Sequence, residues 1–376
     1  MRQTLHCHAD RIELVLASHK VPARVTGGTV TPRLIRYHLS TPLGVKVRQV
    51  EGLSEEIALS LGSPSCRVYR HQGQVEVEVP RAQGQTVPLL PLCQRLAQEG
   101  PHGAATVPPI TAVLGLDHEG TPLLLRLPSP NVAHVLIAGT TGSGKTALAR
   151  TLIASLALHN HPRSLQLLLV DPKNRGFRPF QGLPHLLRPV IADVDQALDA
   201  LSRLVDEMIR RDQQGRDEPR LVLVLDELAD LVQVGGRDME RALTRLTQRG
   251  REAGIHLVAC TQKPAAAVIG SLVKSNFPVR LVGSVASPED AKVATGLART
   301  GAERLLGQGD FLVVAKGQVT RVQAAYLDEG EIESLVAQLQ AGVRPQLLPA
   351  TGTDGGDGRR PGGKLAALRS RLQLVK

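Results

Sequence analysis

The octapeptide GTTGSGKT, residues 139–146, constrains the fold more than any other segment of the chain. It matches the pattern GxxxxGK[ST], follows the apolar run VLIA and precedes a helical pattern over residues 146–158. Glycines let the backbone curl so that successive N–H groups face a phosphate, and the following helix adds its positive N-terminal end. The segment therefore predicts a strand, a phosphate-binding loop and a helix in that order.

The residue types of this loop also predict what it binds. A lysine at position 145 places positive charge on the β and γ phosphates of ATP, and the hydroxyl of Thr146 is a hard oxygen ligand suited to Mg²⁺. ATP and Mg²⁺ are therefore the expected cofactors. The predicted nucleotide-binding residues are Gly139, Thr140, Thr141, Gly142, Ser143, Gly144, Lys145 and Thr146.

Six continuous apolar runs alternate with helical patterns between residues 134 and 326. The runs cover residues 135–138, 165–170, 221–225, 255–260, 279–282 and 311–314. Apolar runs without alternation are typical of strands in a mostly parallel sheet that helices cover on both faces. The pattern predicts an α/β domain with a mostly parallel central sheet and a binding site beyond the carboxyl ends of the strands.

Polar residues directly follow two of these predicted strands. Asp226 and Glu227 come after residues 221–225, where we expect Asp226 to contribute to the metal site and Glu227 to polarise the attacking water. Gln262 follows residues 255–260, at a strand end where an amide can sense the γ-phosphate. The segment Asp171-Pro172-Lys173 occupies a similar edge, and a purely structural role explains it equally well.

The remaining patterns divide the chain into four parts. Residues 1–84 predict a small α+β domain, with strands at 34–39, 45–50 and 74–79 around one helix that starts at Ser54. Residues 85–111 predict a connector with one short helix, and 112–343 the α/β motor domain, which opens with strands at 112–116 and 121–125. Residues 344–376 predict a flexible Gly/Pro-rich linker and a short basic tail, more readily frayed than docked as a helix.

The amino-acid composition indicates which class of binding partner to expect. The formal net charge of +10 favours a polyanion, and only seven residues are aromatic. Proteins that hold single strands usually stack bases on aromatic side chains, so contact with the phosphates of a duplex is the expected mode. No apolar run is long enough to span a membrane, and no secretory leader is evident at the N-terminus. The four scattered cysteines suggest neither a zinc site nor a disulfide framework, which favours a cytoplasmic protein.

Five segments together resemble a known family. HVLIAGTTGSGKT, VDPKNRGFRPFQGLPHLL, LVLVLDELADL, RGREAGIHLVACTQKP and GAERLLGQGDFLV are similar to the motor domain of the FtsK/SpoIIIE double-stranded DNA translocases. The likeness covers most of residues 112–326, and residues 28–80 resemble the family's small preceding domain through TPRLIRYHL and GVKVRQVEGLSEEIALSL. The resemblance implies a RecA-like ATPase that acts as a homo-oligomer, a hexameric ring around duplex DNA.

The same resemblance implies that an arginine from the neighbouring subunit completes each ATP site. Arg251 is the first candidate by its position in RGREAGIH, and Arg249 and Arg280 are rivals. Large family members also carry N-terminal membrane spans and a C-terminal winged-helix module, and this sequence shows neither, which predicts a compact translocase without a membrane anchor. Two alternatives stay open: a related ATPase that moves polypeptide, and an ATP-gated scaffold that does not translocate.

Overall fold

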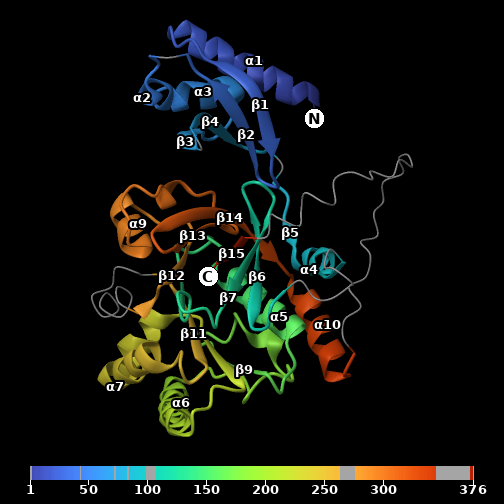
Figure 1. Ribbon diagram of the computed structural model, residues 1–376, viewed down its shortest axis with the longest axis vertical. Helices are drawn as coiled ribbons and strands as arrows, with labels where there is room; N and C mark the ends of the chain where they lie inside the picture. Colours follow the sequence, from blue (N-terminus) through green and yellow to red (C-terminus); the bar gives the residue numbers. More distant parts are fainter. Residues whose placement is uncertain are drawn as a thin grey trace. The chain divides into compact units, whose positions relative to one another are not determined.

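The computed structural model describes residues 2–42, 44–71, 73–82, 84–98, 107–262, 276–343 and 373–375 (Figure 1). The chain forms two compact units, Met1–Thr86 and Val87–Lys376. The predicted linker at residues 344–363 and most of the predicted tail lie outside the described residues.

The first unit is an antiparallel sheet of four strands, in the order β1-β2-β4-β3, packed against helices α1, α2 and α3. Its helices bury Ile12, Val50 and Ile57 against Tyr37 and Val77 of the sheet. Because side chains alternate along a strand, one face of the sheet supplies this core. The elements are α1 (Arg2–Ser18), β1 (Arg24–Val30), β2 (Leu34–Ser40), α2 (Val47–Glu51), α3 (Ser54–Leu61), β3 (Arg67–His71) and β4 (Gln74–Pro80).

This unit contains more helix than the sequence pattern suggested. The prediction of a strand at residues 45–50 is wrong, because α2 starts at Val47 and the Gln49 side chain accepts a hydrogen bond from the Lys46 N–H at 3.2 Å. Helix α1 was not predicted, although Ile12 and Leu16 lie one turn apart and are fully buried. Spacing of four residues between buried side chains is the helical period, so the signal was present but short.

The second unit is built on one large mixed sheet, in the order β15-β7-β6-β14-β13-β12-β8-β11-β10-β9, with the short β5 paired to β14. Neighbouring strands from β12 to β9 are all parallel, and the pairings from β7 to β12 are antiparallel. The strands are β5 (Val87–Pro88), β6 (Thr111–Asp117), β7 (Pro122–Arg126), β8 (Val135–Ala138), β9 (Leu165–Val170), β10 (Arg220–Leu225), β11 (Ile255–Thr261), β12 (Val279–Val282), β13 (Asp310–Ala315), β14 (Gln318–Tyr326) and β15 (Gln373–Val375).

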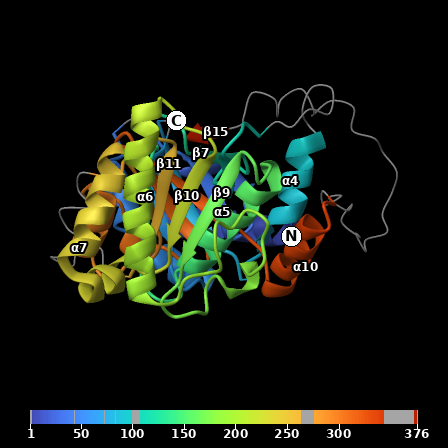
Figure 2. The same ribbon diagram turned by 90° about the horizontal axis from the view of Figure 1, so that it is seen from below.

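Helices cover both faces of this sheet, as Figure 2 shows for the parallel strands. Helices α4, α5 and α10 share one apolar core with the sheet, and α6, α7 and α9 share the other. The predicted α/β fold class with a mostly parallel central sheet and a small preceding α+β domain is confirmed. The helices are α4 (Leu89–Gln98), α5 (Lys145–His159), α6 (Val194–Gln214), α7 (Leu228–Arg249), α9 (Pro288–Thr295) and α10 (Glu329–Gln340), with single 3₁₀ turns at Arg178–Phe180 and Ala302–Arg304.

Two parts of the second unit differ from the predicted domain division. The N-terminal part of the expected connector forms β5 and α4, whose Leu89, Leu92 and Leu96 are almost fully buried in the core, so these residues are part of the second unit. At the other end of the chain, Gln373–Val375 adds a parallel strand beside β7. That pairing satisfies backbone groups of β7 that a sheet edge would otherwise present to solvent.

Helices α6 and α7 each bury a single stripe of side chains. Helix α6 starts at Asp193, whose carboxylate accepts a hydrogen bond from the Gln196 N–H, and it buries Leu201, Leu204 and Met208 at helical spacing. Such one-sided helices suit the surface of a sheet in water. In the described ranges, no helix combines the length and the apolar character that crossing a membrane requires.

Candidate nucleotide site

The loop between β8 and α5 curls as the sequence predicted for a phosphate-binding loop. Gly142 and Gly144 adopt positive φ angles of 83° and 99°, a backbone conformation that other residues rarely tolerate. The Thr140 N–H donates to the carbonyl oxygen of Ser284 at 2.8 Å, which ties the start of the loop to the chain after β12. The Lys145 ammonium donates to the carbonyl oxygen of Thr140 at 2.9 Å, so its side chain reaches back across the loop in which phosphates would bind.

A second loop, residues 307–309, packs against the phosphate-binding loop. The N–H groups of Gln308 and Gly309 donate to the carbonyl oxygens of Gly142 and Ser143, at 3.0 and 2.9 Å. The contact is so close that a Cβ atom added to Gly144 would lie 2.8 Å from the Gly309 nitrogen. The carbonyl groups of Gly142 and Ser143 are thus already paired, as are the N–H groups of Gly139, Thr140 and Ser143, and the N–H groups of other loop residues are left for a ligand.

Thr146 and Asp226 form a pair of oxygen ligands at the base of the loop. The Thr146 Oγ1 donates to Asp226 Oδ1 at 3.1 Å, which brings the first turn of α5 to the carboxyl end of β10. Burial raises the pKa of Asp226, with the Asp171 carboxylate adding to the effect. A hydroxyl and a carboxylate fit Mg²⁺, which takes one or two protein oxygens together with phosphates and water. Among the described residues, no cluster of three or more His, Cys, Asp or Glu offers another metal site.

The loop after β9 closes over this oxygen pair. The Asp171 carboxylate accepts hydrogen bonds from the N–H groups of Gly176 and Phe177, at 2.7 and 3.0 Å, and folds the loop back on itself. A Cβ added to Gly176 would lie 2.9 Å from Thr146 Cγ2. Arg150 on α5 donates to the Gly176 carbonyl oxygen, so helix and loop are fixed to each other. Asp171, for which a structural role was an open alternative, is a loop-shaping residue in this geometry.

Glu227 and Gln262 meet at the ends of adjacent parallel strands. The Gln262 N–H donates to Glu227 Oε1 at 3.2 Å, and Thr261 also hydrogen bonds to the Glu227 carboxylate. Gln262 Oε1 in turn accepts a hydrogen bond from Thr141 Oγ1 at 3.0 Å, which links β11 to the phosphate-binding loop. Burial raises the pKa of Glu227, and a raised pKa makes a carboxylate a better proton acceptor from water.

Side chains of both charges lie near the phosphate-binding loop. Burial lowers the pKa of Lys145, whereas the nearby carboxylates of Glu227 and Asp226 act in the opposite direction. Lys173, in the loop after β9, forms an ion pair with Asp230 on α7 at 3.3 Å. Both lysines therefore lie within reach of the acidic pair, and a bound polyphosphate would meet positive charge on one side and acidic oxygens on the other.

The three candidate arginines lie in different places, and each has a partner away from the phosphate-binding loop. Arg251 precedes β11 and its Nη1 donates to the Pro130 carbonyl oxygen at 3.3 Å, at the end of the sheet opposite Gln262. A seven-residue strand separates the two ends by about 20 Å. Arg249 is paired with Asp212 at 2.8 Å. The half-buried Arg280 donates to the Ala294 carbonyl oxygen at the end of α9, a position suited to stabilising a helix C-terminus.

Comparison with known proteins identifies the family. Residues 1–81 match the model described as the FtsK alpha domain, and residues 97–218 and 212–266 match that of the FtsK/SpoIIIE family. The DNA translocase SftA of Bacillus subtilis (strain 168) is 34% identical over 363 residues, which covers 90% of this chain and 37% of SftA. The chain belongs to the FtsK/SpoIIIE family. It spans less than half the length of this curated relative.

The fold of this FtsK/SpoIIIE chain is also similar to solved structures of more distant proteins. The conjugation coupling protein TcpA of pCW3, in a monomer form with ATPγS, superposes with a TM-score of 0.58 at 20% identity and covers 89% of this chain and 99% of TcpA. The cytoplasmic domain of the type VII secretion ATPase EccC from Thermomonospora curvata gives a TM-score of 0.56 at 25% identity, over 68% of this chain and 34% of EccC. The TcpA likeness is evidence of shared fold.

The FtsK/SpoIIIE site also contains residues that the sequence did not single out. Ser284 and Gly309 act through backbone atoms, and Gly176 acts through the absence of a side chain. Gly309 lies within the family segment GAERLLGQGDFLV, so the resemblance marked its position without a role. No side-chain pattern could identify Ser284, because the contact uses only its carbonyl group.

Proposed function

We propose that this chain is the motor of an ATP-driven double-stranded DNA translocase, which hydrolyses ATP at sites between the subunits of a hexameric ring and moves duplex DNA through the ring. The observation that carries the proposal is that Lys145, Thr146, Asp226 and Glu227 come together at one edge of the sheet. The DNA translocase SftA is similar to this chain over 90% of its length. The net charge of +10 suits a polyanionic substrate.

Each residue of the site has a role in this proposal. N–H groups of the phosphate-binding loop hold the phosphates, and Lys145 exchanges its bond to the Thr140 carbonyl for the β and γ phosphates. Thr146 and Asp226 are the residues that would hold Mg²⁺, which would supply positive charge to neutralise the phosphates. Glu227 orients a water molecule for in-line attack on the γ-phosphate and accepts its proton.

Gln262 is suited to report the state of the γ-phosphate. Its side chain bonds to Thr141 in the loop and its backbone N–H bonds to Glu227, so one residue touches both halves of the site. Loss of the γ-phosphate would change the Thr141 environment first, and the bond to Gln262 would carry that change to β11. This is the sensor role that its position at the strand end suggested.

The location of Arg251 favours a site shared between subunits. At the end of the sheet opposite its own phosphate-binding loop, this arginine serves a neighbouring subunit more readily than its own. An arginine donated in this way stabilises the charge that develops on the transferred phosphoryl group. Arg249 and Arg280 are weaker candidates, because Arg249 forms a 2.8 Å ion pair with Asp212 and Arg280 is half-buried against the end of α9. The contacts of Arg251, with the Pro130 carbonyl oxygen at 3.3 Å and with Glu252 at 3.9 Å, are weaker than such an ion pair.

Steady-state ATP hydrolysis with and without linear duplex DNA tests the proposal. We expect duplex to stimulate the wild type, Lys145→Ala to lose nucleotide binding, and Glu227→Gln to bind ATP while its hydrolysis rate falls at least about tenfold, a barrier increase of ~1.4 kcal/mol. Glu333→Gln, an exposed acid on α10, is a matched control that should leave the rate unchanged. Hydrolysis that duplex does not stimulate would refute the proposed function.

The same assay separates the two alternatives. Stimulation by polypeptides and not by duplex would indicate a polypeptide-moving ATPase, the class to which EccC belongs by its name. Equal rates for the wild type and Glu227→Gln would indicate an ATP-gated scaffold. The higher identity and wider coverage of SftA, compared with EccC, favour DNA as the substrate.

A further inference from the structure

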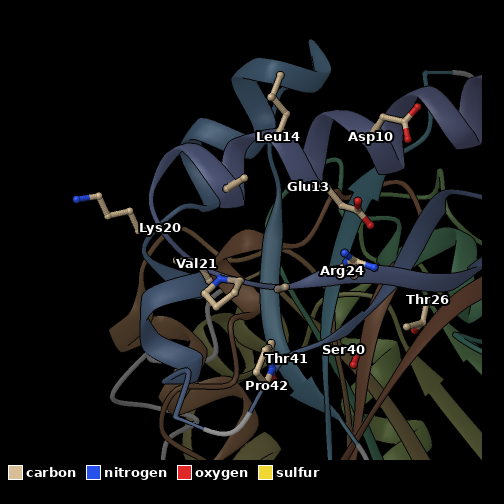
Figure 3. Close-up of a pocket in the computed structure, with 13 residues that line it drawn as sticks. Asp10, Glu13, Leu14, Lys20, Val21, Arg24, Thr26, Ser40, Thr41 and Pro42 are labelled. Carbon is tan, nitrogen blue, oxygen red and sulfur yellow. The ribbon is translucent and has the colours of Figure 1, made fainter.

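A groove lies between α1 and the strands β1 and β2 in the first unit. It consists of two adjoining cavities of about 940 and 290 Å³, and Thr26 lines both; Figure 3 shows the larger one. We name this feature the edge groove. Its walls include Leu5, Ala9, Asp10 and Leu14 from α1 and Thr26 and Val30 from β1.

The edge groove borders a strand that has only one partner. Strand β1 is the first in the order β1-β2-β4-β3, and in the described chain it pairs with β2 alone. Leu14 is 71% exposed and Val30 is 39% exposed, so the groove presents large apolar side chains to solvent. An open strand edge beside an apolar groove is the arrangement by which proteins accept an added strand.

Part of the groove is already shaped around the backbone of β1. The Glu13 carboxylate accepts a hydrogen bond from the Val25 N–H at 2.7 Å, which satisfies one amide at the start of the strand. A register shift between Val25 and Gly27 marks a bulge there. An added strand would therefore pair with the part of β1 beyond this bulge, where the described residues remain exposed.

The strand at the opposite edge of the same sheet, β3, is suited to pair with β1 of a second copy of the chain. Strand β3 ends the order β1-β2-β4-β3, and every pairing within the sheet is antiparallel. Strand directions therefore alternate, and β3 of one copy would run antiparallel to β1 of the next if the sheet continued with its helices on the same face. Arg70 is exposed and shares a face of β3 with Val68, which packs into the helix-side core. The groove is lined by the acids Asp10 and Glu13 and by the bases Lys20 and Arg24, and among them Asp10 offers Arg70 an opposite charge.

We propose that β3 of a second copy of this chain adds to β1 in the edge groove, so that Arg70 of one copy faces Asp10 of the other and the sheets continue head to tail. A contact between two different edges is heterologous, and repetition of such a contact generates rings or filaments and not closed dimers. The choice of a second copy as the occupant rests on the ring assembly proposed above. The contact itself involves the first unit and none of the nucleotide-binding residues.

Directed cross-linking of the full chain tests this contact. Cys7 and Cys66 are replaced by serine, Thr26→Cys and Arg70→Cys are introduced on the same chain, and a short bis-maleimide reagent is added in the presence of a non-hydrolysable ATP analogue and duplex DNA. We expect a ladder of covalent dimers, trimers and larger species on a denaturing gel, and no ladder with either cysteine alone. Dimers from Thr26→Cys alone would show that two β1 edges pair with each other, which would overturn the proposal.

A charge exchange provides a second, independent test. We expect Arg70→Glu to raise the protein concentration at half-assembly at least fivefold, and Asp10→Arg in the same chain to restore it. Glu55→Arg, on an exposed position of α3 outside the groove, is the control that should not restore assembly. Absence of both the ladder and the charge rescue, in a protein whose ATP hydrolysis duplex DNA still stimulates, would refute the edge contact and leave the proposed function intact. A ladder without duplex-stimulated hydrolysis would refute only the function.

Discussion

Gly176→Ala is expected to weaken the metal site without unfolding the protein. The new Cβ would lie 2.9 Å from Thr146 Cγ2 and 3.3 Å from Asp226 Oδ2, where ordinary contacts begin at 3.4 Å. Gly176 is not among the residues with positive φ, so alanine fits its backbone and the effect is one of space alone. Thr146 and the loop must separate by about 0.5 Å to reach an ordinary contact. Adding one carbon to a well-packed site typically costs about 1–3 kcal/mol.

This strain opposes metal binding specifically. The Thr146–Asp226 pair can relax away from the methyl group, but holding Mg²⁺ would require both oxygens at short distances from one point, which leaves less room for that relaxation. An energy of about 1–3 kcal/mol converts to a rise of about 5- to 150-fold in the Mg²⁺ concentration at half-maximal activity. The prediction is checked by titrating Mg²⁺ at saturating ATP and following hydrolysis.

The control for this experiment is another glycine-to-alanine change. Gly330→Ala lies on α10, where the added Cβ would be 3.4 Å from Asp328 Oδ1, an ordinary contact, and it should leave the Mg²⁺ requirement unchanged. A Gly176→Ala protein that unfolds at the wild-type midpoint and needs no more Mg²⁺ than the wild type within a factor of two would refute the reasoning.

Two further predictions concern other parts of the second unit. Burial lowers the pKa of His134 to about 3 and of His256 to about 4, below the unfolded value of 6.5. Stability is therefore complete above pH 6.5 and is lost as the pH falls: urea unfolding at pH 5 should show a loss of about 2 kcal/mol per histidine relative to pH 7, and His256→Gln should remove about half of that pH dependence. For the subunit interface, Arg251→Ala should reduce hydrolysis at least about 100-fold, and mixing it with Glu227→Gln subunits should restore part of the activity, whereas no recovery on mixing would contradict a role in the neighbouring site.

The sequence identified those parts of the site that side-chain chemistry marks. Thr146 and Asp226 lie 80 positions apart, yet the alternation of apolar runs and helical patterns placed both at the carboxyl edge of one sheet, and the structure brings their oxygens within 3.1 Å. The order of the strands in the sheet was harder to predict from the sequence. Residues 107–126 and 310–326 join the parallel strands through antiparallel pairings, and no local pattern states which edge they extend.

Short elements in the first unit show why local patterns fail. The segment VKVRQV, residues 45–50, is rich in β-branched residues and suggests a strand, but Gln49 caps a single helical turn and Val50 becomes fully buried. Packing against the rest of the unit decides between the two conformations, because a five-residue helix has little intrinsic stability. The information that resolves this choice is in the tertiary contacts and not in the segment itself.

Two independent physical reasons explain why the phosphate-binding loop needs glycines, and the sequence pattern reveals only one of them. A positive φ at Gly144 is the reason that the motif alone suggests, because it lets N–H groups converge on phosphate. The structure adds that a side chain there would lie 2.8 Å from the Gly309 nitrogen, and that a Cβ at Gly139 would lie 3.1 Å from the Ser284 carbonyl oxygen. Two separate segments therefore press on the loop from outside, and replacing either glycine would displace the supports that hold the loop carbonyls away from the ligand. The motif is a requirement of the whole unit as much as of the nucleotide.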